Sequence, residues 1–180
     1  MTDKIERQDM RVVLGLDPGS LHTGFGLVEW YPREARIRHI EHGVLNVPTR
    51  LTFFEKLAFL SRELQNLFEV FKPQTTVVER IFLGKNADSA FKLGHVRGIC
   101  IERAVTYGSE VAEYAARRVK KVVTGAGDAD KDHVKLMVCQ LLQVKTTAGL
   151  DATDALALAI CHVREREQAH IKERLLGGGL

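Results

Sequence analysis

The sequence is poor in cysteine and has no long apolar run. Its 180 residues hold only three cysteines, which are widely spaced and form no CxxC pair: Cys100, Cys139 and Cys161. Neither a disulfide framework nor a thiolate metal site is expected from such a set. Residues 1–10 contain no apolar segment, and no later stretch approaches the roughly 18 apolar residues of a membrane span. We therefore expect a cytoplasmic protein with reduced cysteines, neither secreted nor embedded in a membrane.

Several familiar catalytic and binding patterns are also missing. The seven histidines show no HExxH spacing, and the glycines after Asp17 do not form a GxxxxGK[ST] phosphate loop. Residues 128–132 begin like a calcium loop, but His133 stands where that loop needs a glycine. The formal net charge is only +3, so charge alone identifies no partner. These absences argue against a zinc protease, a P-loop nucleotidase and an EF-hand.

Length and apolar pattern predict one α/β domain. A chain of 180 residues with 45% hydrophobic content is long enough for one core. We expect a polar extension over residues 1–10, a single domain over 11–165 and a C-terminal tail over 166–180. The pattern predicts strands over residues 12–16, 24–30, 36–47, 75–78 and 111–114, and helices over 51–71, 88–107, 117–123, 131–144 and 150–168. This order predicts a mixed five-stranded sheet with helices on both faces.

Two of the expected buried strands end in a carboxylate. An apolar run stops at Asp17, and a β-branched run stops at Glu79. In α/β sheets, sites form beyond the carboxyl ends of strands, so the two acids should lie near one another. Each acid has a plainer explanation when it is taken alone, because an Asp before Pro-Gly is an ordinary turn residue.

A second pair of acids opens the last expected helix. Asp151 and Asp154 are three residues apart, so they project from one face of a helix. They could simply cap that helix. However, Asp154 lies in an apolar stretch, where an ionised carboxylate costs several kcal/mol unless it is paired or ligated. Together with Asp17 and Glu79 they would form an all-carboxylate site, which suits Mg²⁺ or Mn²⁺ better than Zn²⁺.

Four ordered segments carry a family resemblance. They are residues 14–20 (LGLDPGS), 79–90 (ERIF and KNADSA), 113–120 (EYAAR and VK) and 151–157 (DATDALA). Each segment is a weak signal by itself. Their order and spacing are similar to those of the RuvC-type crossover junction endodeoxyribonucleases, from about Arg11 to His162. The resemblance implies an RNase H-like fold and paired symmetric nicking of four-way (Holliday) junction DNA in recombination and repair.

The resemblance also implies a cofactor, partners and site residues. It implies Mg²⁺ with Mn²⁺ as a substitute, two ions per site during catalysis, a homodimer, and cooperation with the branch-migration motor of the same pathway. The family's acidic quartet falls on Asp17, Glu79, Asp151 and Asp154. Phe82 matches an aromatic residue that stacks at the junction, and further DNA contacts are expected from Lys85, Arg117, Lys120 and Lys131. Leu21 and His95 depart from the family pattern, which affects fine DNA contacts and no catalytic group.

The expected helix over residues 88–107 carries many apolar residues. They are more than one stripe against a sheet requires: Ala90, Phe91, Leu93, Val96, Ile99, Cys100 and Ala104. A purely intramolecular core would explain them as well as a dimer interface would. The resemblance favours the interface.

Three other functions remain open on the sequence. A resolvase-like nuclease that acts on ribosomal RNA precursors shares the fold, although residues 85–88 and the spacing of Asp151 and Asp154 favour the DNA enzyme. An actin-like ATPase or sugar kinase begins with a similar loop, but it needs two such lobes and the chain is too short for them. A non-catalytic module for branched DNA would keep Phe82 and the basic residues without requiring four acids.

Overall fold

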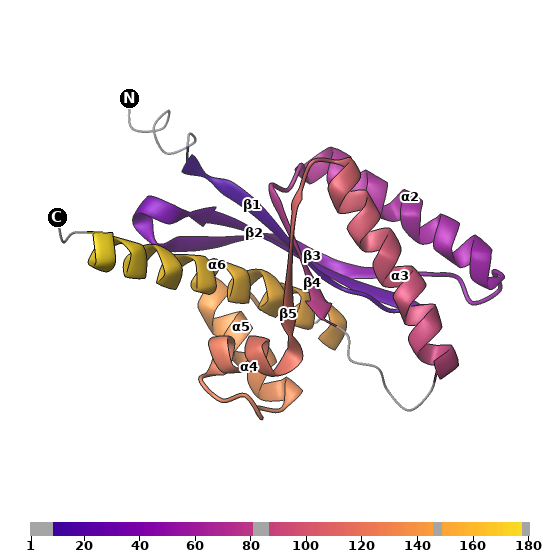
Figure 1. Ribbon diagram of the computed structural model, residues 1–180. Coiled ribbons are helices and arrows are strands. Elements are labelled where there is room, and N and C mark those ends of the chain that lie inside the picture. The colour runs from indigo at the N-terminus through magenta and orange to yellow at the C-terminus, as the bar shows by residue number, and fades with distance from the viewer. Residues whose placement is uncertain (1–8, 81–86, 146–148, 178–180) are drawn as a thin grey trace.

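A five-stranded mixed sheet forms the centre of the computed structural model, which describes residues 9–80, 87–145 and 149–177 (Figure 1). The strand order is β3-β2-β1-β4-β5. The strands are β1 (Arg11–Asp17), β2 (His22–Tyr31), β3 (Arg36–Asn46), β4 (Thr75–Arg80) and β5 (Glu110–Ala115). The helices are α2 (Phe53–Phe71), α3 (Ala87–Thr106), α4 (Ala116–Thr124), α5 (Lys131–Leu142) and α6 (Leu150–Gly177), with a short 3₁₀ helix η1 (Pro32–Glu34).

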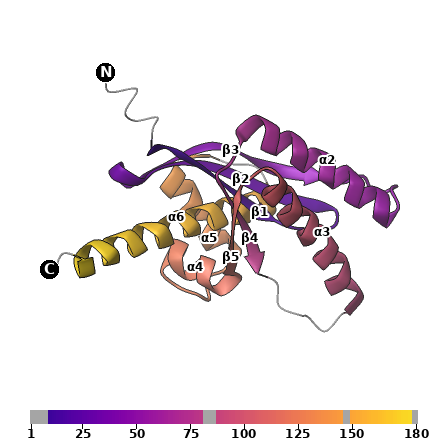
Figure 2. The same ribbon diagram turned by 45° about the horizontal axis from the view of Figure 1, so that its top comes forward.

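The topology matches the order that the sequence predicts. Strands β1, β2 and β3 form an antiparallel meander, whereas β4 and β5 pair parallel to β1 on its other side. Helices α2 and α3 cover one face of the sheet, and α4, α5 and α6 lie on the opposite face (Figure 2). The prediction of a mixed five-stranded sheet with helices on both faces is confirmed.

The core has two layers because the central strands are buried on both faces. Alternate residues of β1 point to opposite sides, so Val13 packs in the cluster beneath α6 while Leu14 and Leu16 pack beneath α2 and α3. Strand β4 does the same with Val77 and Val78. This alternation fixes which face each strand-end carboxylate occupies.

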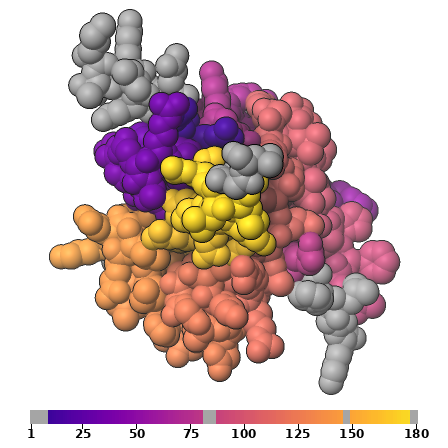
Figure 3. Space-filling view, turned by 60° about the vertical axis from the view of Figure 1, so that its left-hand side comes forward, coloured from indigo at the N-terminus to yellow at the C-terminus, as the bar shows by residue number. Residues whose placement is uncertain are grey.

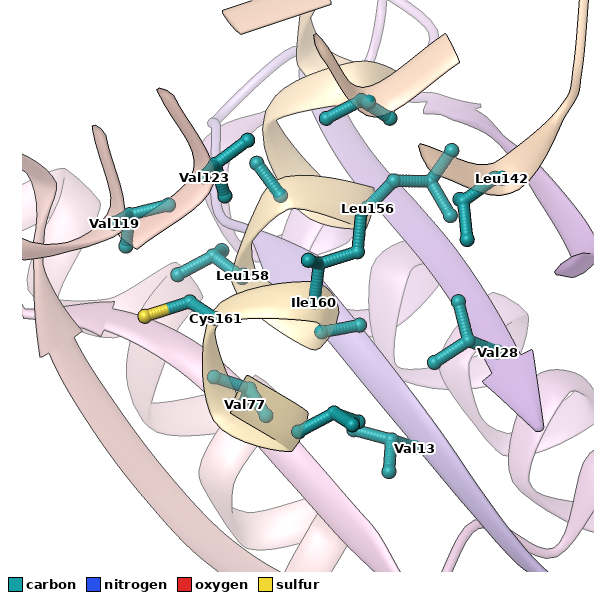
Figure 4. Packing of buried hydrophobic residues seen from close by; sticks show 14 of the residues in the cluster. Val13, Val28, Val77, Val119, Val123, Leu142, Leu156, Leu158, Ile160 and Cys161 are labelled. Carbon is teal, nitrogen blue, oxygen red and sulfur yellow. The ribbon is translucent and has the colours of Figure 1, made fainter. Parts of the chain in front are cut away.

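Helix α6 lies unusually close to the sheet. A Cβ atom on Gly15 would sit 1.9 Å from the carbonyl oxygen of Ala155, and one on Gly24 would sit 2.1 Å from that of Asp151. Only glycine permits such an approach of backbone to backbone. The buried part of α6, from Ala152 to Val163, is covered by α4 and α5 on its far side (Figure 4). The first turns of α6 are therefore held firmly over the ends of β1 and β2.

Helix α6 is longer than the sequence pattern indicates. The apolar pattern predicts an end near Gln168, but the helix continues to Gly177 through the segment that was expected to be a tail. Good helix formers and an i,i+3 contact between His170 and Glu173 support this exposed part, which Figure 3 shows on the surface beside β2 and β3. Within the described ranges, no helix is long and apolar enough to cross a membrane.

Candidate active site

A cleft of about 160 Å³ opens where β1, β4 and α6 meet. Three of the four predicted acids line it, from three different elements: Asp17, Glu79 and Asp154. Lys120 from α4 and Lys131 from α5 also line it. Figure 1 shows why these elements converge, because the carboxyl end of β4 lies beside the beginning of α6.

The register of the sheet places the two strand-end acids side by side. Leu16 of β1 is paired with Val78 of β4 in the parallel ladder, so the next residues are Asp17 and Glu79. Because side chains alternate along a strand, these acids share the face of Val13 and Val77, which is the face beneath α6. The predicted neighbourhood of Asp17 and Glu79 is confirmed.

The two acids of α6 occupy different positions. Helix α6 begins at Leu150, so Asp151 lies inside the first turn and is not the capping residue. The carboxylate of Asp154 accepts a hydrogen bond of 2.8 Å from Nζ of Lys131. Asp151 does not line the cleft, but its charge acts on Asp17. The structure thus brings three acids into one cleft, and the fourth is near enough for its charge to act on Asp17.

The electrostatics of the cleft call for a cation. Burial and the nearby charges of Glu79, Asp154 and Asp151 raise the pKa of Asp17 to about 7. Burial and the charge of Asp154 also raise the pKa of Glu79, although Lys131 and Lys120 oppose the shift. Like charges that are crowded in a partly buried site resist simultaneous ionisation. The hydrogen bond to Asp154 raises the pKa of Lys131, so Lys131 carries part of the compensating charge.

The donor set fits a hard divalent cation. Four carboxylates without histidine or cysteine are the ligands that Mg²⁺ and Mn²⁺ prefer. In the conformation with Lys131 paired to Asp154, no three Asp, Glu, His or Cys side chains of the described residues are close enough to share a metal ion. The acids would need side-chain movements to ligate one, and Asp154 would exchange its lysine partner for the cation.

The remaining predicted DNA contacts are placed unevenly. Lys120 faces the cleft, whereas Arg117, three residues earlier on α4, is exposed and packs near Gly127 outside it. Phe82 and Lys85 lie outside the described residues. One residue that the sequence did not single out does touch the site, since Nε of Arg97 donates a hydrogen bond of 3.2 Å to the main-chain oxygen of Glu79.

The raised pKa of Asp17 predicts a pH-dependent stability of the metal-free protein. Its pKa is about 7 in the folded state against the ordinary value of 3.8, so the stabilising contribution of the bound proton is complete below pH 3.8 and disappears as pH rises through about 7. Asp17→Asn should remove this loss. The free energy of unfolding of Asp17→Asn is compared with that of the wild type at each pH. We expect this difference to shift in favour of Asp17→Asn by about 1–3 kcal/mol between pH 5 and pH 8.

Denaturant unfolding in EDTA at the two pH values measures this gain. Asp128→Asn is the matched control, because Asp128 is exposed and does not line the cleft. An equal and pH-independent effect of the two substitutions would contradict the assignment of Asp17 to a crowded acidic site.

Comparison with known proteins identifies the family. The family model described as crossover junction endodeoxyribonuclease RuvC matches residues 13–162. A RuvC from Bdellovibrio bacteriovorus is 45% identical over 163 residues, covering 91% of this chain and 96% of the relative. One from Pseudomonas fluorescens is 39% identical over 171 residues, covering 95% of this chain and 93% of the relative.

Solved structures agree with this match. The structure described as T. thermophilus RuvC in complex with Holliday junction substrate superposes with a TM-score of 0.80 at 27% identity, covering 88% of this chain and 96% of that one. The yeast mitochondrial Holliday junction resolvase Ydc2 has a TM-score of 0.59 at 16% identity, which supports the fold alone. The fold is RNase H-like, as the family resemblance implies. On these matches, the chain belongs to the RuvC family of crossover junction endodeoxyribonucleases.

Proposed function

We propose that this chain resolves four-way DNA junctions by paired, metal-dependent hydrolysis of phosphodiester bonds in opposite strands. The observation that carries the proposal is the cleft in which Asp17, Glu79 and Asp154 face Lys120 and Lys131. Family membership and the Thermus thermophilus relative in complex with a Holliday junction support the same substrate. We assign the nuclease domain to residues 11–165 and its place of action to the cytoplasm.

Mg²⁺ is the proposed cofactor, held by Asp17, Glu79, Asp151 and Asp154, with Mn²⁺ as a substitute. Two ions during catalysis would activate a water molecule and stabilise the leaving oxygen. The role of the four carboxylates is to hold and orient that charge. Burial and the crowding of these acids raise the pKa of Asp17, which supports this role because a bound cation would stabilise the ionised carboxylates.

The two lysines of the cleft are proposed to bind the phosphate next to the cut. Lys131 donates a hydrogen bond to Asp154 in the structure. On DNA binding, its ammonium group would donate to a phosphate oxygen instead. Lys120 lines the same cleft from α4, one turn beyond Arg117, which is proposed to contact the DNA backbone farther out. Phe82 and Lys85 are proposed as junction contacts from the sequence alone.

The active unit is proposed to be a two-fold symmetric dimer. A groove of about 810 Å³ runs along the outer side of α3 and includes Phe91, whose exposed fraction is 71%. A four-way junction has approximate two-fold symmetry, so an isologous dimer would present two identical clefts to its opposed strands. Cooperation with a branch-migration motor is a further proposal from family membership.

Cleavage assays with defined substrates test this function. Purified protein with Mg²⁺ should nick a synthetic four-way junction symmetrically, and EDTA should stop the reaction. Linear duplex DNA of the same sequence and structured RNA should remain largely uncut. Preferred cutting of the RNA would favour the ribosomal RNA nuclease, and junction binding without any cutting would favour the non-catalytic module.

A further inference from the structure

Helix α3 has one face buried against the sheet and one face exposed to solvent. Its inner face packs against the sheet through the fully buried residues Val96, Cys100 and Ala104. Its outer face carries the apolar groove that includes Phe91 and Ile99. Figure 2 shows α3 beside α2 on the side of the sheet opposite α6. The helix therefore lies between the proposed dimer interface and the proposed active site.

Arg97 makes the polar contacts between α3 and the carboxyl end of the sheet. Its Nε donates a hydrogen bond of 3.2 Å to the main-chain oxygen of Glu79, at the end of β4. Its guanidinium also forms an ion pair with the carboxylate of Glu113 on β5, and the two side chains are only 22% and 33% exposed. The side chain of Arg97 thus connects α3 to β4 through a main-chain oxygen and to β5 through a carboxylate.

The register explains why these two partners are within reach of one guanidinium. Val78 of β4 is paired with Glu113 of β5, so Glu113 lies one residue behind Glu79 on the neighbouring parallel strand. The carbonyl that accepts the hydrogen bond belongs to Glu79 itself. Fixing that carbonyl fixes the Glu79–Arg80 peptide plane, which contains the Cα atom that carries the Glu79 side chain in the cleft.

We propose that Arg97 is a positioning residue that transmits the placement of α3 to Glu79. The hydrogen bond from Nε holds the main chain of Glu79, and so the base of the side chain that would ligate the metal, while the ion pair with Glu113 orients the guanidinium. Support of this kind around metal ligands contributes about 10- to 100-fold to metal affinity or activity. The inference rests on the proposed role of Glu79 as a metal ligand.

Two substitutions separate the hydrogen bond from the ion pair. Arg97→Lys keeps a positive charge beside Glu113 but lacks the planar fork that serves both partners at once. Glu113→Gln removes the ion pair and leaves the Nε–H available to Glu79. Arg97→Met removes both contacts. Arg103→Gln is the matched control, because Arg103 lies on the same helix and pairs only with Glu102 among the contacts of the described residues.

The first measurement needs no DNA and no catalysis. Thermal unfolding is followed as MgCl₂ is titrated, and the Mg²⁺ concentration that gives half of the full stabilisation is recorded. We expect this midpoint to rise about 10- to 100-fold in Arg97→Lys and Arg97→Met. It should change less than about threefold in Glu113→Gln and not at all in Arg103→Gln, because both keep the contact with Glu79.

Junction cleavage and junction binding are then measured on the same proteins. Arg97→Lys should slow cleavage at limiting Mg²⁺ and recover at high Mg²⁺, while its junction affinity in EDTA stays within about twofold of the wild type. If Arg97→Lys and Glu113→Gln lower the melting temperature equally and neither shifts the Mg²⁺ midpoint, Arg97 is only a structural tie and the inference is wrong.

The proposed function fails in a different way from this inference. A wild type that is stabilised by Mg²⁺ but never cuts a junction would refute the nuclease assignment, and the Mg²⁺ midpoints would still decide the role of Arg97. A wild type that cuts junctions and an Arg97→Lys protein with a normal midpoint would leave the nuclease standing and overturn the positioning role.

Discussion

Asp154→Asn should abolish junction cleavage while leaving junction binding intact. Asp154 lies in the cleft with Asp17 and Glu79, and its charge contributes to the raised pKa of both. The amide keeps the shape of the side chain but removes the negative charge that would bind Mg²⁺. Removing a central catalytic group typically costs a factor of about 10³ or more in rate. We expect a loss of at least this size under single-turnover conditions.

Binding should survive because phosphate contacts and metal ligation reside in different residues. Without the carboxylate of Asp154, Lys131 loses its acidic partner and is free to meet DNA, so junction affinity should stay equal or rise slightly. The measurements are cleavage of a labelled four-way junction in Mg²⁺ and a mobility shift in Ca²⁺ or EDTA. Asp128→Asn is the control, since Asp128 is exposed outside the cleft. Cleavage by Asp154→Asn at near the wild-type rate would refute the assignment of the acidic site.

The sequence was sufficient for the strands and for the positions of their acids. Strand β1 is buried on both faces, so its apolar run and its stop at Asp17 are visible without any tertiary information. The same is true of β4 and Glu79. Once two parallel strands each end in an acid, their adjacency follows from the general rule on sheet edges. These predictions succeeded because local pattern and tertiary environment agree there.

Contacts between distant segments were beyond the reach of the sequence. The ion pair between Lys131 and Asp154 joins residues 23 apart in the chain, and no periodicity predicts it. Arg97 binds a main-chain oxygen, which every residue possesses, so its partner leaves no mark on the sequence. The close approach of α6 to Gly15 and Gly24 became interpretable only when the helix was seen to rest on the sheet. In each case the missing information is three-dimensional proximity.

The outer face of α3 should tolerate a new side chain in the monomer but not in a dimer. Gly94 and Gly98 lie one turn apart in the groove, and a Cβ atom on either would meet no atom of the described residues within 4 Å. A glycine inside a helix costs about 1 kcal/mol relative to alanine. Gly98→Glu should therefore leave the folded monomer at least as stable as the wild type, so a loss of function would not reflect misfolding.

In the proposed two-fold dimer, the same substitution puts a carboxylate from each subunit into an apolar contact. Burying unpaired charge at the centre of an interface costs about 2 kcal/mol or more, so the dimer dissociation constant should rise at least about 30-fold. Sedimentation equilibrium measures this change. Gln168→Glu is the control, because it adds the same charge to an exposed position of α6, on the opposite face of the sheet.

Cleavage of a supercoiled cruciform tests how dissociation of the proposed dimer changes the pattern of cutting. A dimer presents two clefts to one junction, so the wild type should cut both strands within the lifetime of one complex and yield linear product. Gly98→Glu monomers would deliver single, independent nicks, and nicked circles should accumulate instead. Paired cutting by a Gly98→Glu protein with monomer mass would show that α3 does not form the interface. The identical clefts would then have to be brought together by another surface.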